Sequence, residues 1–504
     1  MILRRRRPGA VDPRPWRPII VLSLIPLPTV VDGQDAAPLA LRAARLVAPD
    51  DALAAVAAEQ LEAAGVRVVE AGAAEEDGAT PVVLRLDAAA GPGGSAEPER
   101  YTLRVTAAGV EATAPEPVGL LHAVRTLRQL VPAAGAAEGV REVPAVVVHD
   151  APRYRWRGLS FDVVRHWFGP EDIRAVVDLV GAFKLRVLHL HLTDDQGWRI
   201  ETPSRPELEK ASDSQVGGGT AGFLTVDDFR ELQEYAAARF VTIVPEFDMP
   251  GHINAATQVY GALTKDGLPT EPYEGIEVGF SRLWFDNPAT EPFLRDVIGD
   301  VASMTQGEWV HVGGDEVHTM EVEEFAKFVE LAARIVREHG KTPIFWQEGA
   351  RGPVEPGTLL QYWEPKGEEF ARFVAAARAG ARFIMSPGNH AYLDMKYTPE
   401  HDLGLHWAGY VELRDSYDWE PTAVIDGLPA DAVEGVEAAV WTETLTTRDE
   451  LFSMLLPRLG AVAEVAWTAP ERKDWEAFRA RTAAQAPAWR AGGWAFHQTP
   501  QVDW

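Results

Sequence analysis

The stretch RVLHLHL at residues 186–192, followed at once by TDDQGW at 193–198, shows the pattern that decides the fold of most of the chain. An apolar run of strand length ends abruptly in carboxylates, an amide and an indole. Seven other short runs share this character: GLSFDV (158–163), FVTIVPEF (240–247), WVHVG (309–313), PIFW (343–346), TLLQYW (358–363), RFIMS (382–386) and EAAVW (437–441). Helical stretches separate most of these runs, at 170–183, 225–238, 320–339 and 367–379. Strands that alternate with helices in this way predict a (β/α)8 TIM barrel of the α/β class.

One connection of the predicted barrel departs from this pattern. Between Trp346 and Thr358 the chain contains EGARGPVEPG, at 348–357. This segment is too short, and too rich in glycine and proline, for a full helix. We therefore expect the fifth helix of the barrel to be missing.

The part of the chain before the barrel has a different texture. It is rich in alanine and glycine, with β-like runs at 82–86 and 101–106 and helical stretches at 52–65 and 117–131. Strands and helices mixed in this way predict a small α/β domain. The predicted organisation is a disordered segment at 1–17, the small domain at 18–150, the catalytic barrel at 151–490 and a tail at 491–504.

Composition excludes several classes of partner and cofactor. The chain has 504 residues with a net charge of −27, a field that repels nucleic acid and anionic membranes, so neither is expected as a partner. Cysteine is absent, which excludes disulfides and thiolate metal sites. The sequence shows no glycine-rich phosphate loop or dinucleotide fingerprint, so no cofactor is expected. Nothing in it indicates an oligomeric state.

The N-terminal residues partly resemble a secretion signal. Arg4 to Arg7 are basic, and IIVLSLI at 19–25 is apolar, but prolines lie between and after them and no clean cleavage site follows. This pattern favours a cytoplasmic over a secreted protein. No apolar stretch reaches the length of about 18 residues that a membrane-spanning helix needs.

Polar and aromatic side chains follow every predicted strand, at the end where a parallel barrel has its active site. In chain order they are Arg165, Asp194, His252, Asp315 and Glu316, Trp346, Trp363, Tyr392 and Asp394, and Trp441 and Glu443. Carboxylates bind hydroxyls and move protons, whereas indoles cover the apolar faces of sugar rings. This combination at one rim predicts a carbohydrate site.

Six sequence runs carry a resemblance to a known family. They are RGLSFDVVRHWF (157–168), HLHLTDDQGWRIE (189–201), PEFDMPGH (245–252), HVGGDE (311–316), AYLDMKY (391–397) and AVWTET (439–444). Together they resemble glycoside hydrolase family twenty, the β-N-acetylhexosaminidases, over about residues 20 to 490. The resemblance implies an exo-acting enzyme that hydrolyses terminal non-reducing β-linked GlcNAc or GalNAc in oligosaccharides, with retention of configuration.

Asp315 and Glu316 are the candidate catalytic carboxyls. Because neighbours in an extended chain point in different directions, they cannot easily act as acid and nucleophile on opposite sides of one bond. The nucleophile must then come from elsewhere, and by resemblance it is the substrate's 2-acetamido oxygen, which forms an oxazolinium ion. The resemblance makes Glu316 the general acid and base, and Asp315 the acceptor of the acetamido N–H. Tyr392 would donate its hydroxyl to the acetamido oxygen.

The same resemblance assigns the residues that bind and support. Arg165 would bind the C3 and C4 hydroxyls with its fork of donors. The remaining contacts with the sugar fall to Asp394 and Glu443 on the O4 and O6 side, to Trp346, Trp363 and Trp441 as walls, and to Trp407 on the aglycone side. Asp194 and His252 would form a relay that reaches Glu316. No metal is expected among these groups.

Two alternatives stay open from the sequence. A metal-dependent barrel hydrolase could use His189 and His191, which lie on one face of their strand, with His252 or His311 as a third ligand. A non-catalytic sugar-binding barrel would keep the same fold without turnover. Activity that survives chelation argues against the first alternative, and hydrolysis of a nitrophenyl N-acetylglucosaminide argues against the second.

Overall fold

The computed structural model describes residues 22–69, 78–133, 139–365 and 369–504, which contacts divide into two units. The first unit holds the described residues up to Arg153 with Trp467–Trp494 and Gln498–Trp504; the second holds Tyr154–Ala466 and Ala495–His497. The sequence prediction extended the barrel to residue 490. Instead, contacts group α13 (Trp475–Ala491) with the first unit. The segment predicted as disordered, 1–17, lies outside the described residues.

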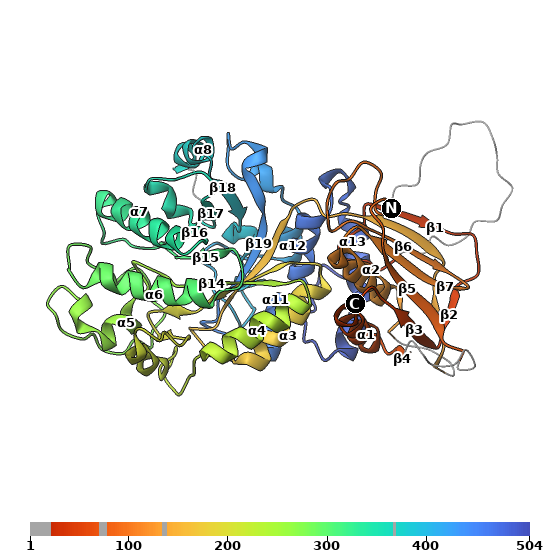
Figure 1. The fold of residues 1–504 in the computed structure, drawn as a ribbon, viewed down its shortest axis with the longest axis horizontal. Helices are drawn as coiled ribbons and strands as arrows, with labels where there is room; N and C mark the ends of the chain where they lie inside the picture. Colours follow the sequence, from red (N-terminus) through yellow and green to blue (C-terminus); the bar gives the residue numbers. More distant parts are fainter. Residues whose placement is uncertain (1–21, 70–77, 134–138, 366–368) are drawn as a thin grey trace. The chain divides into compact units, whose positions relative to one another are not determined.

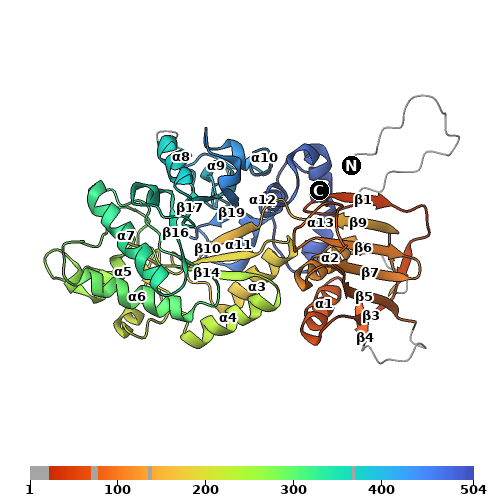
Figure 2. The ribbon, with the colours of Figure 1, turned by 45° about the horizontal axis from the view of Figure 1, so that its top comes forward.

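The first unit is built on a seven-stranded sheet with two helices on one face (Figure 2). In sheet order the strands are β1 (Val30–Gly33), β9 (Val146–Asp150), β6 (Tyr101–Thr106), β7 (Gly109–Ala114), β5 (Thr80–Leu86), β3 (Ala43–Val47) and β4 (Arg67–Val69). A separate pair joins β2 (Leu39–Leu41) to β8 (Arg141–Val143). Helix α1 (Asp51–Ala63) begins where Asp50 accepts a hydrogen bond from Leu53 N, and α2 (Pro117–Leu130) begins with a proline.

The second unit contains a closed barrel of eight parallel strands (Figure 1). They are β10 (Trp156–Asp162), β11 (Val187–His191), β14 (Thr242–Glu246), β15 (Trp309–His311), β16 (Thr342–Trp346), β17 (Leu359–Tyr362), β18 (Arg382–Met385) and β19 (Val433–Val440). The barrel closes where β19 pairs with β10, with Gly435 opposite Trp156. Each observed strand overlaps one predicted strand, so the predicted fold class is confirmed.

Helices connect most of the barrel strands. The longer connecting helices are α3 (Pro170–Ala182), α4 (Val226–Ala238), α6 (Thr290–Met304), α7 (Val322–Glu338) and α8 (Phe370–Arg378), and α11 (Arg448–Leu455) and α12 (Arg458–Trp467) follow the last strand. Short helices α5 (Asn254–Val259), α9 (Gly388–Ala391) and α10 (Leu413–Tyr417) lie in the loops. Between β16 and β17, the described segment holds only a 3-10 turn, η5 (Gln347–Arg351), so the fifth helix is missing as predicted. Within the described residues, no helix is both long and apolar enough to cross a bilayer.

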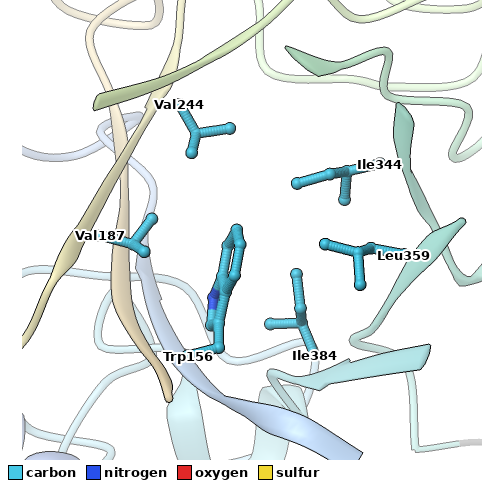
Figure 3. Close-up of a cluster of buried hydrophobic side chains, with 6 residues drawn as sticks. All are labelled: Trp156, Val187, Val244, Ile344, Leu359 and Ile384. Atoms are coloured by element: carbon cyan, nitrogen blue, oxygen red, sulfur yellow. The ribbon is translucent and has the colours of Figure 1, made fainter. Parts of the chain in front are cut away.

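Apolar side chains fill the barrel interior near the beginning of its strands. Figure 3 shows six of them pointing toward one another: Trp156, Val187, Val244, Ile344, Leu359 and Ile384. All six are buried, so this end of the barrel is a packed core rather than a pore. The polar residues of the site lie toward the opposite ends of the strands.

Candidate active site

The acidic pair follows β15 on a tight turn. Gly313 and Gly314 have φ values of 72° and 103°, and Glu316 has φ 51°, all in the region that disfavours a side chain. A Cβ at Gly313 would lie 1.8 Å from Asp248 Oδ1, and Gly314 N donates a hydrogen bond of 3.0 Å to that oxygen. The two glycines therefore let the backbone approach Asp248 and carry Asp315 and Glu316 into the barrel mouth.

Asp248 lies beside Asp315, and both carboxyls are buried. Burial raises the pKa of Asp315, although nearby His252 acts in the opposite direction. Burial and the Asp315 carboxyl raise the pKa of Asp248 well above its usual range. The pKa of Asp248 is shifted further than that of Asp315, so of the two carboxyls Asp315 is the better hydrogen-bond acceptor. Asp315 Oδ1 is buried without a hydrogen-bond partner in the described structure.

A relay connects Glu316 to the second strand end. His252 Nε2 lies 3.4 Å from Glu316 Oε2, and His252 Nδ1 lies 3.1 Å from Asp194 Oδ1. Burial lowers the pKa of His252, but Asp194 and Asp248 outweigh it and raise the pKa well above its usual value. The Glu316 side chain is 24% exposed, so solvent and substrate can reach it. The structure thus brings together the three residues that the sequence assigned to this relay.

Arg165 lies beside the relay and the aromatic residues. Its Nη2 is 2.7 Å from Asp194 Oδ2 and its Nη1 is 3.5 Å from Asp162 Oδ2. Its guanidinium carbon lies 4.8 Å from the centre of the Trp441 ring. Burial opposes its charge, but Asp194 and Asp162 raise the pKa of Arg165 well above its usual value. The cation is therefore held in one orientation by three neighbours.

Four aromatic residues, Trp346, Trp363, Tyr392 and Trp441, form what we call the aromatic cluster. Ring centres lie 6.0 Å apart for Trp346 and Trp441, 6.2 Å for Tyr392 and Trp441, and 6.3 Å for the stacked Trp363 and Tyr392. Trp407 packs edge-on against Trp363 and Tyr392, each at 5.4 Å, and is 47% exposed. Trp407 therefore lies at the open side of the cluster.

Asp394 and Glu443 form a second pair of carboxyls. Burial raises the pKa of Glu443 to about 7, and Arg165 opposes this shift. Burial and the charge of Glu443 raise the pKa of Asp394 well above its usual value. Both carboxyl oxygens of Asp394 are buried without a hydrogen-bond partner among the described residues. These oxygens are available to the hydroxyls of a ligand.

Sequence reasoning assigned no role to several acidic residues of the site. Glu246 ends β14 and accepts a hydrogen bond of 2.6 Å from Trp346 Nε1. Asp248 accepts a hydrogen bond from Gly314 N, in the turn that carries Asp315 and Glu316. Glu348 lies in the 3-10 turn η5 and accepts a hydrogen bond of 3.2 Å from Trp363 Nε1. For Glu246, the signal was a carboxylate inside an apolar strand, which must find a partner.

Groups of acidic and histidine residues that could bind a metal also occur here. One is His191, Glu246 and Asp248, whose ligand atoms all lie within 4.8 Å of one another. His191, however, has both ring nitrogens against carboxylates, at 2.6 Å from Glu246 Oε2 and 2.8 Å from Asp194 Oδ2. Because ionised carboxylates only accept, His191 must donate from both nitrogens and is not a metal ligand in this state.

An α/β barrel that presents carboxylates, an arginine and a cluster of indoles at its C-terminal mouth defines a glycoside hydrolase. Comparison with known sequences narrows the class. Residues 154–470 match "Glycosyl hydrolase family 20, catalytic domain", and residues 21–151 match "Glycosyl hydrolase family 20, domain 2". The chain belongs to glycoside hydrolase family 20, which confirms the resemblance seen in its motifs.

Individual relatives agree with this assignment. A beta-N-acetylhexosaminidase of Cellulomonas fimi is 51% identical over 490 residues, which cover 96% of this chain and 97% of that protein. The N-acetyl-beta-hexosaminidase of Streptomyces plicatus, solved with Thio-NAglucal, is similar with a TM-score of 0.90 and 41% identity, covering 97% of this chain and 99% of that one. The family 20 enzyme of Streptomyces coelicolor A3(2) has a TM-score of 0.90 and 39% identity, over 97% and 100% of the two chains.

Proposed function

We infer that the protein removes terminal, non-reducing, β-linked N-acetylhexosamine from oligosaccharides, with retention of anomeric configuration. The observation that carries this inference is a pair of groups that fit a secondary amide. Among the described residues, Asp315 Oδ1 is a buried acceptor without a hydrogen-bond partner, and the Tyr392 side chain is buried in the aromatic cluster. Burial and the charge of Asp315 raise the pKa of Tyr392 well above its usual value, so its hydroxyl remains a donor. An acetamido group offers the complementary N–H and carbonyl.

The reaction follows from these contacts. Asp315 accepts the acetamido N–H while Tyr392 orients the carbonyl oxygen toward the anomeric carbon. That oxygen forms a bond to the carbon as the glycosidic bond breaks, and Glu316 gives its proton to the leaving oxygen. Asp315 stabilises the positive charge of the resulting oxazolinium ion. Glu316 then removes a proton from water, which opens the ring with a second inversion and so restores the starting configuration.

The known relatives support this proposal. The Cellulomonas fimi relative is named a beta-N-acetylhexosaminidase. A variant of the Streptomyces plicatus enzyme, solved in complex with its product GlcNAc, is similar to this chain with a TM-score of 0.91. A pocket built for the 2-acetamido group makes that group a requirement of the reaction, rather than a preference.

Two measurements test the proposal. The protein should hydrolyse a nitrophenyl β-N-acetylglucosaminide and leave the matching β-glucoside intact, because the glucoside lacks the nucleophile. NMR of the first product should show the β anomer. Comparable rates on both glycosides, or an α anomer as first product, would overturn the mechanism. Failure to turn over the N-acetylglucosaminide would favour a sugar-binding barrel, and loss of activity on chelation would favour a metal-dependent enzyme.

A further inference from the structure

The barrel interior carries a chain of ion pairs that ends at the proposed acid/base. At the C-terminal ends of β11 and β14, Glu246 Oε2 lies 2.6 Å from His191 Nδ1. His191 Nε2 lies 2.8 Å from Asp194 Oδ2, and Asp194 Oδ1 lies 3.1 Å from His252 Nδ1. His252 Nε2 then reaches Glu316 Oε2 at 3.4 Å. Every member before Glu316 is buried, so each contact is little screened by water.

His191 is the charged centre of this chain. Burial lowers the pKa of His191, but Glu246 and Asp194 outweigh it and raise the pKa to about 9. The imidazolium shares Asp194 Oδ2 with Arg165, whose Nη2 lies 2.7 Å from that oxygen. Asp194 Oδ2 is therefore held between two cations, which fixes the orientation of the carboxylate. The position of Asp194 Oδ1 relative to His252 is fixed with it.

The two oxygens of Glu246 face different sets of partners. Oε2 lies 2.6 Å from His191 Nδ1 and 3.1 Å from His189 Nε2. Oε1 accepts a hydrogen bond of 2.6 Å from Trp346 Nε1 and lies 3.1 Å from His311 Nδ1. The Trp346 ring is a fully buried member of the aromatic cluster. Because the two oxygens belong to one planar group, a rotation or loss of this carboxylate moves both sets of partners at once.

We propose that Glu246 is a positioning residue that couples the acid/base relay to the acetamido-binding side of the site. Through His191 it fixes the relay that orients Glu316. Through Trp346 it fixes the wall against which the acetamido group is held. This inference rests on the proposed function, because it assigns Glu246 to the geometry of that reaction.

The change His191→Gln tests the relay arm. A poor leaving group needs a proton from Glu316, whereas a dinitrophenolate leaves without one. For His191→Gln we expect kcat/KM for a β-1,4-linked N-acetylglucosamine disaccharide to fall about 100-fold, and for the dinitrophenyl N-acetylglucosaminide less than about threefold. His122→Gln is the matched control, because it also removes a buried histidine that pairs with a carboxylate, Glu99, but it lies in the first unit and has no contact with Glu246 in the described structure. This control should leave the ratio of kcat/KM between the two substrates unchanged.

The change Trp346→Phe tests the other arm, since phenylalanine keeps an aromatic face and removes the N–H that binds Glu246. A thiazoline analogue of the oxazolinium intermediate should bind about tenfold more weakly to this variant. The ratio of kcat/KM between the two leaving groups should stay within about threefold of wild type. Glu246→Gln is nearly isosteric but carries no charge. The contact with the His191 imidazolium and the hydrogen bond from Trp346 both lose their charge assistance, so the variant should show both effects together.

Thermal unfolding of each variant is measured first, and Glu246→Gln carries the test if His191→Gln does not fold. Equal losses on both leaving groups in the His191 variant would overturn the proposal, as would the same discrimination in the His122 variant. A Glu246 variant that shows only one of the two effects would also overturn it. A wild-type protein that hydrolyses neither N-acetylglucosaminide would instead overturn the proposed function, so the two failures are distinguishable.

Discussion

The turn at Gly313 allows a direct test of how the barrel places its acidic pair. In Gly313→Ala the new Cβ would lie 1.8 Å from Asp248 Oδ1. Real Cβ atoms essentially never approach another heavy atom more closely than 3.0 Å, so this oxygen must move by about 1.2 Å (3.0 − 1.8). Asp248 is buried against Asp315 and bonded to Gly314 N, so it cannot move alone.

The magnitude follows from two contributions. A side chain at a φ of 72° costs about 1–2 kcal/mol of stability. The lost hydrogen bond between Gly314 N and Asp248 leaves buried polar groups unsatisfied, at about 1–3 kcal/mol. Gly313→Ala should therefore lower the free energy of unfolding by roughly 2–5 kcal/mol. A shift of about 1 Å passed on to Asp315 should lower kcat by about 100-fold.

Gly314→Ala is the matched control for this prediction. Its φ of 103° makes the backbone strain at least comparable, but its Cβ would meet nothing closer than Phe325 at 3.6 Å. Denaturant unfolding and kcat on a nitrophenyl N-acetylglucosaminide should be measured for both variants. Activity should fall much further in the Gly313 variant. Equal losses in the two variants would refute the argument from close approach to Asp248.

Three further predictions follow from the site. Glu316→Gln and Asp315→Asn should each lose at least about 100-fold in kcat, with unfolding temperatures close to wild type; a near-normal rate in either would contradict its assigned role. Tyr392→Phe should raise KM and lower kcat for N-acetylglucosaminides by about tenfold, and steady-state kinetics would show it. Burial raises the pKa of Glu348 to about 8 from a usual value of 4.5, so the stability that this carboxyl contributes is full below about pH 4.5 and is lost as pH rises through about 8. Glu348→Gln should remove this dependence, so its unfolding free energy relative to wild type should rise between about pH 5 and about pH 9; a constant difference would count against the shift.

The strands of the barrel and the residues at their ends could be predicted from the sequence. Each strand is a short apolar run, and the side chain that follows a parallel strand must lie at one end of the barrel. Asp315 and Glu316 follow β15 in this way, and Trp346 ends β16. Local sequence order therefore carried most of the information about which residues meet.

Features that depend on contacts across the chain could not be predicted in the same way. Glu348 stands in a segment whose glycine and proline content indicates only a loop, and its contact with Trp363 arises from the path of the turn. Helix α13 carries Pro487 in its interior, and its contacts are long-range: Arg481 Nη1 donates to Leu24 O, 457 positions away. A local pattern indicates that a helix forms, but does not indicate the core that it joins.

The paired carboxyls Asp394 and Glu443 set the charge that this corner of the site presents to a ligand. In each, burial raises the pKa, and neither Asp394 oxygen has a partner in the described structure. A sugar hydroxyl at this corner can donate a hydrogen bond to an Asp394 oxygen, which accepts none in the described structure. A sulfate or carboxylate there would bring a further negative charge to the buried Asp394 and the half-buried Glu443, with Arg165 as the neighbouring cation that opposes the shift at Glu443. This corner of the site is thus complementary to a neutral hydroxyl rather than to an anion.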